Sequence, residues 1–454
     1  MAESRKRQKE NKERRLREAK ERAERWQQQK KTEIVYLGEE VSGGLSDKTS
    51  DPEKLNAYNL PDFADAAALA RAMQISVGKL RFLAFNRRVN KISHYKRFYM
   101  RKKSGGKRLI SAPMPQLKAA QHWLLENVLY KVPVHTAVHG FVPGRSIVSN
   151  ARPHVGADVV VNIDLKDFFP TVKYKRAKGA FAALGYSQHI ATIFALLCTE
   201  PEVDVVELDG QPWYVAKGDR VLPQGAPTSP ALTNIICKRL DARLSGLARK
   251  FGFAYTRYAD DMTLSASGDA AGQVSKILGM VRRVLYEEGF HLHPDKLRVM
   301  RNGQRKEVTG IVVNDKLAVP RKRYRKFKAL LFQVEMDGPE GKSWEGAENF
   351  WEAIRGYAAF VKMVEPVRGT ALLEHVERLQ EKHAPRPKKK RKPQAETSSN
   401  DIDVAIDGGD PSEETPPKKR RKYPHERNKP NQNDENSENP NDADGEDKPW
   451  WKIW

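Results

Sequence analysis

The sequence predicts a mixed α+β fold, because β-hairpin patterns and amphipathic helix patterns both occur in its central part. Residues 253–265 place apolar and aromatic runs on either side of Asp260-Asp261, which is typical of a hairpin with two acids at its tip. A second hairpin pattern covers residues 95–110, where a Ser-Gly-Gly turn is flanked by basic side chains. Residues 271–289 and 350–364 carry apolar side chains at helical spacing.

The charge of the chain predicts a polyanionic partner. Its 454 residues carry a formal net charge of +23, and the isoelectric point is about 9.7, which favours nucleic acid or a membrane surface. No apolar run approaches the roughly 18 residues of a membrane span, and the N-terminus has no signal-peptide core. Cys198 and Cys237 lie in apolar surroundings without metal-ligand spacing. We therefore expect reduced core cysteines, a cytoplasmic location, and nucleic acid rather than a membrane as the partner.

The chain divides into a charged arm, a central body and a polar tail. Residues 1 to about 31 are consistent with a solvated helix or a disordered basic arm, and residues 32–60 with a connector. From Ala384 the chain is rich in polar residues with two Lys/Arg clusters, and we expect it to be disordered. Its last residues, Pro449–Trp454, include three tryptophans and predict a docking peptide for the core or for another protein. Further helix patterns cover residues 61–85 with a break near Ile75, 116–130, 177–199, 231–247 and 321–332.

Three acidic residues predict a metal site. Asp260 and Asp261 are neighbours whose charges repel each other, so we expect a cation there, with a solvated turn as the alternative. Residues 159–165 form a buried-strand pattern that contains Asp164, and an acid in that place is costly unless it is paired or metal-bound. Together the three carboxylates could hold two Mg²⁺ about 3.5–4 Å apart. Strand alternation points Asp167 in a different direction, so we favour Asp164.

Two further stretches have the composition of nucleotide-binding segments. The basic turn at residues 102–108 can place Lys and Arg on a phosphate chain or a nucleoside triphosphate, with a solvated turn as the alternative. Residues 222–230 form a tight loop with three prolines. In this loop Gly225 lets a backbone approach a ligand, and Gln224 offers an amide to a base or sugar. A plain helix cap is the alternative for this loop.

The motifs together resemble the ordered A, B and C motifs of reverse transcriptases: Asn162-Ile163-Asp164, residues 223–230 and Tyr258-Ala259-Asp260-Asp261. The basic hairpin resembles the fingers of these enzymes, and Lys296 resembles their motif D. Two more stretches are similar to the Asn-Ala-x-x-His and Val-Thr-Gly elements of retron reverse transcriptases: Asn150-Ala151-Arg152-Pro153-His154 and Val308-Thr309-Gly310. The resemblance covers roughly residues 60–380, and the long extensions resemble the larger, myxobacterial-like members.

The resemblance implies a right-hand polymerase with fingers, a palm built on an antiparallel sheet, and a helical thumb. The charged arm and the tail lie outside this unit. We expect an arm and connector at residues 1–60, fingers at 61–157, a palm at 158–315 with finger elements around 173–220, a thumb at 316–383, and the tail at 384–454.

The resemblance also implies roles for single residues. Asp164, Asp260 and Asp261 would bind two Mg²⁺, which activate the attacking hydroxyl and stabilise the leaving pyrophosphate. Lys296 would join them in catalysis by protonating that pyrophosphate. The dNTP site would comprise Lys107, Arg108, Phe169, Gln224, Gly225 and Tyr258, with Phe169 as the steric gate against a ribose 2′-hydroxyl. RNA binding would fall to Asn150, His154, Val308, Thr309, Gly310, Arg321, Lys322 and Arg325.

The implied function is RNA-directed DNA synthesis by a retron in the bacterial cytoplasm. A cognate structured non-coding RNA would be both template and primer. Synthesis from dNTPs would start at an internal guanosine 2′-hydroxyl and yield branched, RNA-linked single-stranded DNA (msDNA), commonly for defence against phage. The sequence contains no recognisable effector motif or RNase H acid cluster, so a host RNase H and an effector would be separate proteins. The alternatives are a group II intron-like or other bacterial reverse transcriptase, and a non-catalytic RNA-binding scaffold, which the clustered acids disfavour.

Overall fold

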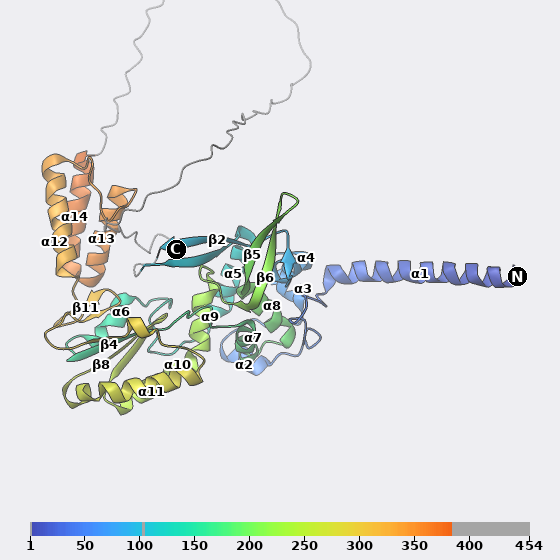
Figure 1. The fold of residues 1–454 in the computed structure, drawn as a ribbon, viewed down its shortest axis with the longest axis horizontal. Coiled ribbons are helices and arrows are strands. Elements are labelled where there is room, and N and C mark those ends of the chain that lie inside the picture. The colour runs from blue at the N-terminus through green and yellow to red at the C-terminus, as the bar shows by residue number, and fades with distance from the viewer. Residues whose placement is uncertain (1, 102–104, 384–454) are drawn as a thin grey trace, which may run out of the picture.

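The centre of the structure is a four-stranded antiparallel sheet with strand order β7-β8-β4-β9 (Figure 1). Its strands are β4 (Val159–Asp164), β7 (Ala254–Tyr258), β8 (Asp261–Ala266) and β9 (Arg298–Met300). The register of β4 and β8 places Asp164 opposite Asp261. Side chains alternate along β4, so Val159 and Val161 enter one hydrophobic core while Val160 enters another. The sheet therefore separates two cores.

The computed structural model describes residues 2–101 and 105–383. The predicted tail of residues 384–454, with its basic clusters and tryptophans, lies outside the described residues, as do Lys102 and Lys103 of the basic turn. In the described part of the chain, no helix is long and apolar enough to cross a bilayer.

The larger core joins the sheet to helices between residues 52 and 287. Its centre is α8, where every side chain from His189 to Cys198 is buried. Phe181 and Tyr186 pack against Phe194 of this helix, with ring centroids 5.2 and 5.1 Å apart. The helices here are α2 (Pro52–Ala57), α3 (Ala66–Ala72), α4 (Val77–Ala84), α5 (Pro115–Asn127), α7 (Tyr174–Ala183), α8 (Gln188–Cys198), α9 (Thr228–Ile236), α10 (Lys238–Lys250) and α11 (Val274–Glu287).

Short helices connect these elements. They are α6 (Ile147–Ala151) and the 3₁₀ turns η1 (Leu129–Lys131), η2 (Arg152–His154), η3 (Gly268–Gln273) and η4 (Pro294–Lys296).

Two smaller β-structures project from the same body. β2 (Tyr95–Arg101) and β3 (Lys107–Pro113) form the predicted basic hairpin. The other is a three-stranded sheet of order β1-β6-β5, formed by β1 (Val89–Asn90), β5 (Glu200–Leu208) and β6 (Gln211–Val221). The sequence pattern does not predict this second sheet. Most of β5 is exposed on both of its faces, so it lacks the alternation of apolar and polar residues by which a half-buried strand is recognised.

The smaller core joins the sheet to three C-terminal helices. Phe327, Trp344 and Tyr357 pack ring against ring at centroid distances between 4.6 and 5.0 Å. Gly369 allows two helices to approach closely, because a Cβ atom there would lie 2.0 Å from the backbone of Lys362. The elements are α12 (Arg321–Asp337), α13 (Phe350–Val364) and α14 (Pro366–His383), with the short pair β10 (Glu307–Val308) and β11 (Ile311–Val312).

Two predicted helices are each divided in the structure. The stretch 177–199 splits into α7 and α8, because the chain turns at Gly185 with a φ of +108° and Ser187 then caps α8 by accepting a hydrogen bond from Ile190 N. The stretch 231–247 belongs to α9 and α10, which meet at Cys237. The helix at 350–364 has its predicted bounds, whereas α14 is absent from the sequence prediction.

One long helix, α1 (Ala2–Thr32), extends from the body (Figure 1). The sequence pattern allows a solvated helix or a disordered arm, and the structure contains the helix.

Gly369→Ala is expected to destabilise the C-terminal helices, because the added methyl group would overlap the Lys362 backbone and overpacking costs about 1–3 kcal/mol. The matched control is Gly279→Ala in α11, where nothing lies within 4 Å of the Cβ position. Alanine should stabilise that exposed helical site by about 0.5–1 kcal/mol. Urea unfolding measures both changes, and equal stability of the two variants would contradict the close packing of α13 and α14.

Candidate active site

Three carboxylates meet where β4 and β8 pair. Asp164 ends β4, and Asp261 begins β8 directly opposite it. Asp260 lies in the turn between β7 and β8, and its carbonyl accepts a hydrogen bond of 3.1 Å from Leu165 N. This bond ties the turn to the end of β4. The two acidic motifs, nearly 100 residues apart in the sequence, are thereby brought together.

The two acids of the turn have raised pKa values. Burial, followed by the charge of Asp164, raises the pKa of Asp260. Asp261 is exposed as a residue, yet the protein atoms around its carboxyl desolvate that group. This desolvation, followed by the charges of Asp260 and Asp164, raises the pKa of Asp261 to about 7. Lys296 and Arg108 oppose both shifts without cancelling them. The site therefore has an excess of negative charge.

Lys296 supplies a positive charge beside the first acid. Its ammonium group donates hydrogen bonds to both carboxylate oxygens of Asp164, at 2.9 and 3.0 Å. The backbone brings it there, because His293 N donates to the Asp164 carbonyl at 2.8 Å and Leu292 forms a β-bridge with Leu165. η4 then carries Lys296 toward the acid. The predicted association of Lys296 with the acids thus has a structural basis, while its chemical role stays a prediction.

The chemistry of the three acids fits a hard divalent cation, which prefers carboxylate oxygens. In the described ranges, no three Asp, Glu, His or Cys side chains are gathered closely enough to enclose an ion as they stand. Asp164 is instead engaged by Lys296 in an ion pair of 2.9 Å. Metal binding would exchange that ammonium group for an ion.

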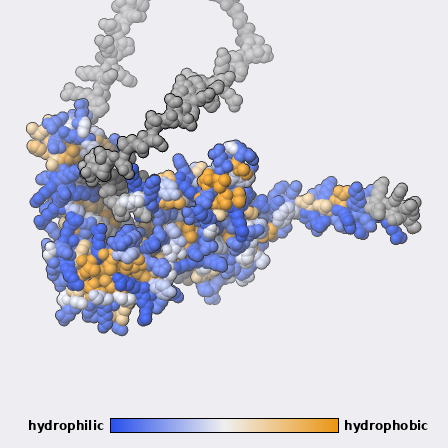
Figure 2. Space-filling view, viewed as in Figure 1, coloured by the Kyte–Doolittle hydropathy of each residue, from blue (hydrophilic) through white to orange (hydrophobic). Residues whose placement is uncertain are grey.

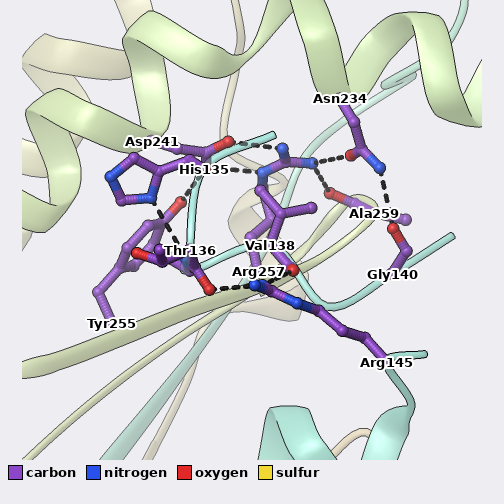
Figure 3. A network of polar contacts seen from close by, with 11 residues as sticks. His135, Thr136, Val138, Gly140, Arg145, Asn234, Asp241, Tyr255, Arg257 and Ala259 are labelled. Atoms are coloured by element: carbon purple, nitrogen blue, oxygen red, sulfur yellow. Dashed lines mark hydrogen bonds and ion pairs between the residues drawn. The ribbon is translucent and has the colours of Figure 1, made fainter. Parts of the chain in front are cut away.

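A buried arginine supports the turn between the acids (Figure 3). The side chain of Arg257 is fully buried, and its guanidinium donates two hydrogen bonds to Asp241 of α10, at 2.8 and 2.6 Å. A further N–H group lies 3.1 Å from the Ala259 carbonyl and 3.0 Å from the Asn234 amide oxygen. Ala259 has a φ of +56°, a left-handed conformation that non-glycine residues seldom adopt. Arg257 therefore stabilises the strained residue that precedes both acids.

The loop that follows η1 completes this support. The Asn234 amide donates to the Gly140 carbonyl at 2.9 Å. Gly140 lies so close to the turn that a Cβ atom would be 2.6 Å from Ala259 N, so a larger residue would displace the turn. Arg145 holds the same loop by donating to the carbonyls of Thr136 and Val138 (Figure 3).

Sequence reasoning missed Arg257, Asp241 and Asn234 as residues of the site. The available signal is Arg257 itself, a charge inside an apolar strand pattern, which requires a buried partner. The partner could not be identified from the pattern, because Asp241 lies 16 residues earlier on a separate helix.

The predicted triphosphate-binding residues and the predicted steric gate lie on separate elements. Lys107 and Arg108 are exposed at the start of β3, and the charge of Arg108 lowers the pKa of both acids in the turn. Phe169 is half-buried in the turn after β4, and its ring centroid lies 5.4 Å from that of Phe168. Tyr258 is half-buried immediately before the acidic turn. Their contacts with a nucleotide stay predictions.

The predicted pocket loop is joined to the basic hairpin by backbone contacts. The Gln224 carbonyl accepts a hydrogen bond of 2.8 Å from Ser111 N of β3. Gly225 has a φ of +119°, and a Cβ atom there would lie 2.8 Å from the Ser111 carbonyl oxygen. Glycine is therefore needed for packing at this position, beside any role toward a ligand.

The two predicted RNA-recognition elements lie side by side. The Asn150 amide donates to the Thr309 hydroxyl at 3.4 Å, which joins α6 to the turn between β10 and β11. Thr309 is partly exposed in that turn, and Gly310 is exposed with a φ of +83°. The contact spans 159 positions of the sequence. The structure therefore gives the two elements one shared surface.

Three of the predicted RNA-binding residues in these elements are buried. Asn150, His154 and Val308 are each 0% exposed. The ring nitrogens of His154 lie 2.7 Å from the hydroxyl groups of Ser265 and Thr256. Burial lowers the pKa of His154 to about 3, so its ring is neutral. These three side chains have no exposed surface in the free protein, so direct RNA contact by them would require a local rearrangement. Their role in RNA binding stays a prediction.

The predicted basic residues of α12 are accessible. Arg321, Lys322 and Arg325 are exposed, whereas Arg323 is half-buried and donates two hydrogen bonds of 2.7 Å to Glu345. The three exposed residues present positive charge to the solvent, and their contact with RNA stays a prediction.

Asp261→Asn is expected to raise the melting temperature of the metal-free protein by a few degrees at about pH 8, and by less near about pH 5. The pKa of Asp261 is higher in the folded protein than in the unfolded chain. The folded state therefore binds the extra proton between these two pKa values, and stability falls as the pH rises toward 7. Asparagine removes that loss. Calorimetry in the presence of chelator measures the melting temperature at both pH values. Asp269→Asn, at an exposed acid of η3, is the control. An equal change in melting temperature at both pH values would contradict the raised pKa of Asp261.

Arg257→Met is expected to destabilise the protein by about 3–5 kcal/mol, because it leaves Asp241 buried without a partner. The double variant Arg257→Met/Asp241→Leu should recover much of that stability, since neither charge remains. It should not recover the rate of nucleotide addition, because the Ala259 carbonyl still lacks its donor. Urea unfolding and steady-state kcat separate the two effects. Full activity of the double variant would show that Arg257 contributes to stability alone.

The chain is similar in sequence to known proteins over most of its length. The family profile of reverse transcriptase (RNA-dependent DNA polymerase) matches residues 100–330. The chain is similar to the retron Mx162 reverse transcriptase of Myxococcus xanthus, with 43% identity over 77% of this chain and 76% of the relative. It is 32% identical to the retron Ec86 reverse transcriptase of Escherichia coli, over 75% of this chain and 97% of the relative. Among solved structures, foamy viral protease-reverse transcriptase with an RNA/DNA hybrid is 16% identical, with a TM-score of 0.30 over 64% of this chain and 34% of that one. The chain belongs to the retron reverse transcriptases, a family of RNA-directed DNA polymerases.

Proposed function

We propose that this enzyme copies a cognate structured non-coding RNA that serves as both template and primer. Synthesis would begin at an internal guanosine 2′-hydroxyl of that RNA and yield branched, RNA-linked single-stranded DNA (msDNA). Membership of the retron family and the three acids at the junction of β4 and β8 support this proposal. The acids are the observation on which it rests, because the excess of negative charge requires cations and these acids lie where the polymerase motifs meet.

In this proposal Asp164, Asp260 and Asp261 hold two Mg²⁺. When bound, the ions would activate the attacking hydroxyl and neutralise charge on the transferred phosphate and the leaving pyrophosphate. The protein's own contribution is positioning. Arg257 fixes the turn that carries two of the acids, and Leu165 N fixes that turn against the strand that carries the third.

The incoming dNTP would be bound from the side of the basic hairpin. Arg108 would contact the triphosphate together with Lys107, and the influence of Arg108 on both acids of the turn supports that position. Gln224, Gly225 and Tyr258 would line the nucleotide pocket. Phe169 would exclude a ribose 2′-hydroxyl, and its packing on Phe168 restricts the movement of its ring.

Lys296 would protonate the leaving pyrophosphate. Its hydrogen bonds to both oxygens of Asp164 hold the ammonium group at the site before substrate binds. Release of Asp164 to a cation would leave these N–H groups free to donate to pyrophosphate oxygens.

The cognate RNA would contact the exposed parts of two surfaces. These are the turn at Thr309-Gly310 and the face of α12 with Arg321, Lys322 and Arg325. We propose that the complex acts in the bacterial cytoplasm in defence against phage, together with a host RNase H and a separate effector protein.

Expression of the chain with its upstream flanking DNA is expected to yield a discrete small single-stranded DNA, whose mobility shifts after RNase and debranching treatment. The double variant Asp260→Asn/Asp261→Asn should yield none, because it removes two of the three carboxylates. It should still bind the RNA, since neither acid lies on the surfaces proposed to contact it. Gel analysis of total nucleic acid and RNA co-purification measure both effects.

Synthesis by the double variant would refute the metal assignment. If the wild-type protein gives no branched product but extends an annealed primer on RNA, the self-priming step is refuted while the polymerase remains.

A further inference from the structure

The base of α1 is anchored in the larger core. Ile34 and Leu37, just after the helix, are 1% and 0% exposed and belong to that core. Glu33 forms an ion pair of 3.5 Å with Lys48. The Lys30 ammonium group lies 5.0 Å from the ring centroid of Trp26. The chain therefore leaves the body in a fixed direction, and 31 helical residues extend for about 46 Å.

The charges on α1 are distributed unevenly around its axis. Lys12, Arg15, Ala19 and Arg22 are spaced three, four and three residues apart, so they lie on one face, which we call the basic seam. All four are exposed. Neither Lys12 nor Arg15 has an ion-pair partner within the residues that the structure describes, and Arg22 donates to a backbone carbonyl, that of Glu18.

Glu18 lies at the edge of this seam, three residues after Arg15 and four before Arg22, whereas other acids of the helix lie away from it. Glu13, Glu21 and Glu24 fall on the opposite face at 3.6 residues per turn. Arginines nearer to the acids are paired, since Arg14 lies 3.9 Å from Glu18 and Arg25 lies 4.0 Å from Glu21. The seam is thus the side of the helix on which positive charge is least compensated.

A bilayer and a second copy of the helix both fit this surface poorly. Figure 2 shows the described part of the helix as predominantly hydrophilic, and Leu16 and Trp26 are its two exposed large apolar side chains. Binding in a membrane interface requires an apolar face. Pairing with a second helix requires apolar residues along the seam, where this helix has Lys12, Arg15 and Arg22 beside Ala19.

Single-stranded nucleic acid fits poorly as well. Proteins that bind single-stranded nucleic acid stack its bases on successive aromatic rings. Trp26 is the single aromatic residue in the sequence of α1, and it is engaged by Lys30 near the body. A rigid row of cations without aromatic rings suits the regular phosphates of a duplex instead.

We propose that α1 is a rigid arm whose basic seam binds the phosphate backbone of a double-stranded RNA segment outside the catalytic site. This inference rests on the proposed function, in which the substrate is a structured RNA. α1 projects from the body on the side away from α12 (Figure 1). The arm would therefore hold a part of the RNA distant from the surface of α12, and it would add affinity without taking part in nucleotide addition.

Two matched triple variants of the full chain test the arm. The seam variant is Lys12→Gln/Arg15→Gln/Arg22→Gln, and the control is Arg14→Gln/Arg17→Gln/Lys20→Gln on the other side of the helix. Each removes one lysine and two arginines, and glutamine has a helix propensity close to theirs. Fluorescence anisotropy with a long RNA hairpin at several salt concentrations measures affinity and its salt dependence. Circular dichroism checks that the helix persists.

The seam variant is expected to bind the hairpin at least about tenfold more weakly at low salt, with a salt slope reduced by about 2–3, because each lost phosphate contact removes about 0.7–0.9. The control should change affinity less than about threefold. Both variants should extend a short annealed primer on RNA at the wild-type rate.

Equal weakening by both variants would overturn the proposal, because net charge and not the seam would then govern binding. Unchanged binding by the seam variant would overturn it as well. A DNA duplex of the same length is the second probe, and seam-dependent binding of DNA without that of RNA would exclude RNA as the partner. Failure of the wild-type protein to extend the short primer would count against the proposed function and not against the arm.

Discussion

The polymerase site depends on a pair of charges that never meets the solvent. Arg257 and Asp241 are both fully buried, and each would be strongly destabilising without the other. Two nitrogens of the guanidinium group bind Asp241, and the third donates to Asn234 and to the carbonyl of Ala259. A single side chain thereby connects two helices to the turn of the central sheet. The turn can hold an unfavourable backbone conformation because this interior network compensates for it.

The charges of the site are not balanced, in contrast to the buried ion pair that supports it. In the interior, the charge of Arg257 is balanced by that of Asp241. At the turn, three carboxylates have, among the described residues, only Lys296 and Arg108 as the positive charges that act on Asp261. Lys296 occupies the side of Asp164 in the free protein. The enzyme is therefore stable without its substrate while keeping two acids that gain from binding a cation.

The sequence predicted the acidic site more completely than the buried network that supports the acidic turn. Asp164, Asp260 and Asp261 each belong to a short local pattern, and the register of β4 and β8 confirms that these patterns meet. The network around Arg257 joins residues from several elements, so no local pattern contains it. Burial of His154 and Asn150 also escaped prediction, because each polar side chain finds its partner more than 100 positions away. The mixed fold is confirmed, whereas the β5–β6 hairpin lacked the alternation on which strand prediction depends.

The contact between Gly225 and Ser111 couples two parts of the proposed nucleotide site mechanically. β3 carries Arg108 at one end and Ser111 near the other, and Ser111 N donates a hydrogen bond to the backbone of the pocket loop. The Ser111 carbonyl also lies close to Gly225, so a displacement of one backbone segment presses on the other. A shift of the hairpin toward a triphosphate would therefore carry the loop with Gln224 along, and the recognition of phosphate and of base or sugar would tighten as one movement. In such a site, a nucleotide that fits the pocket poorly would also be held less firmly by its phosphates.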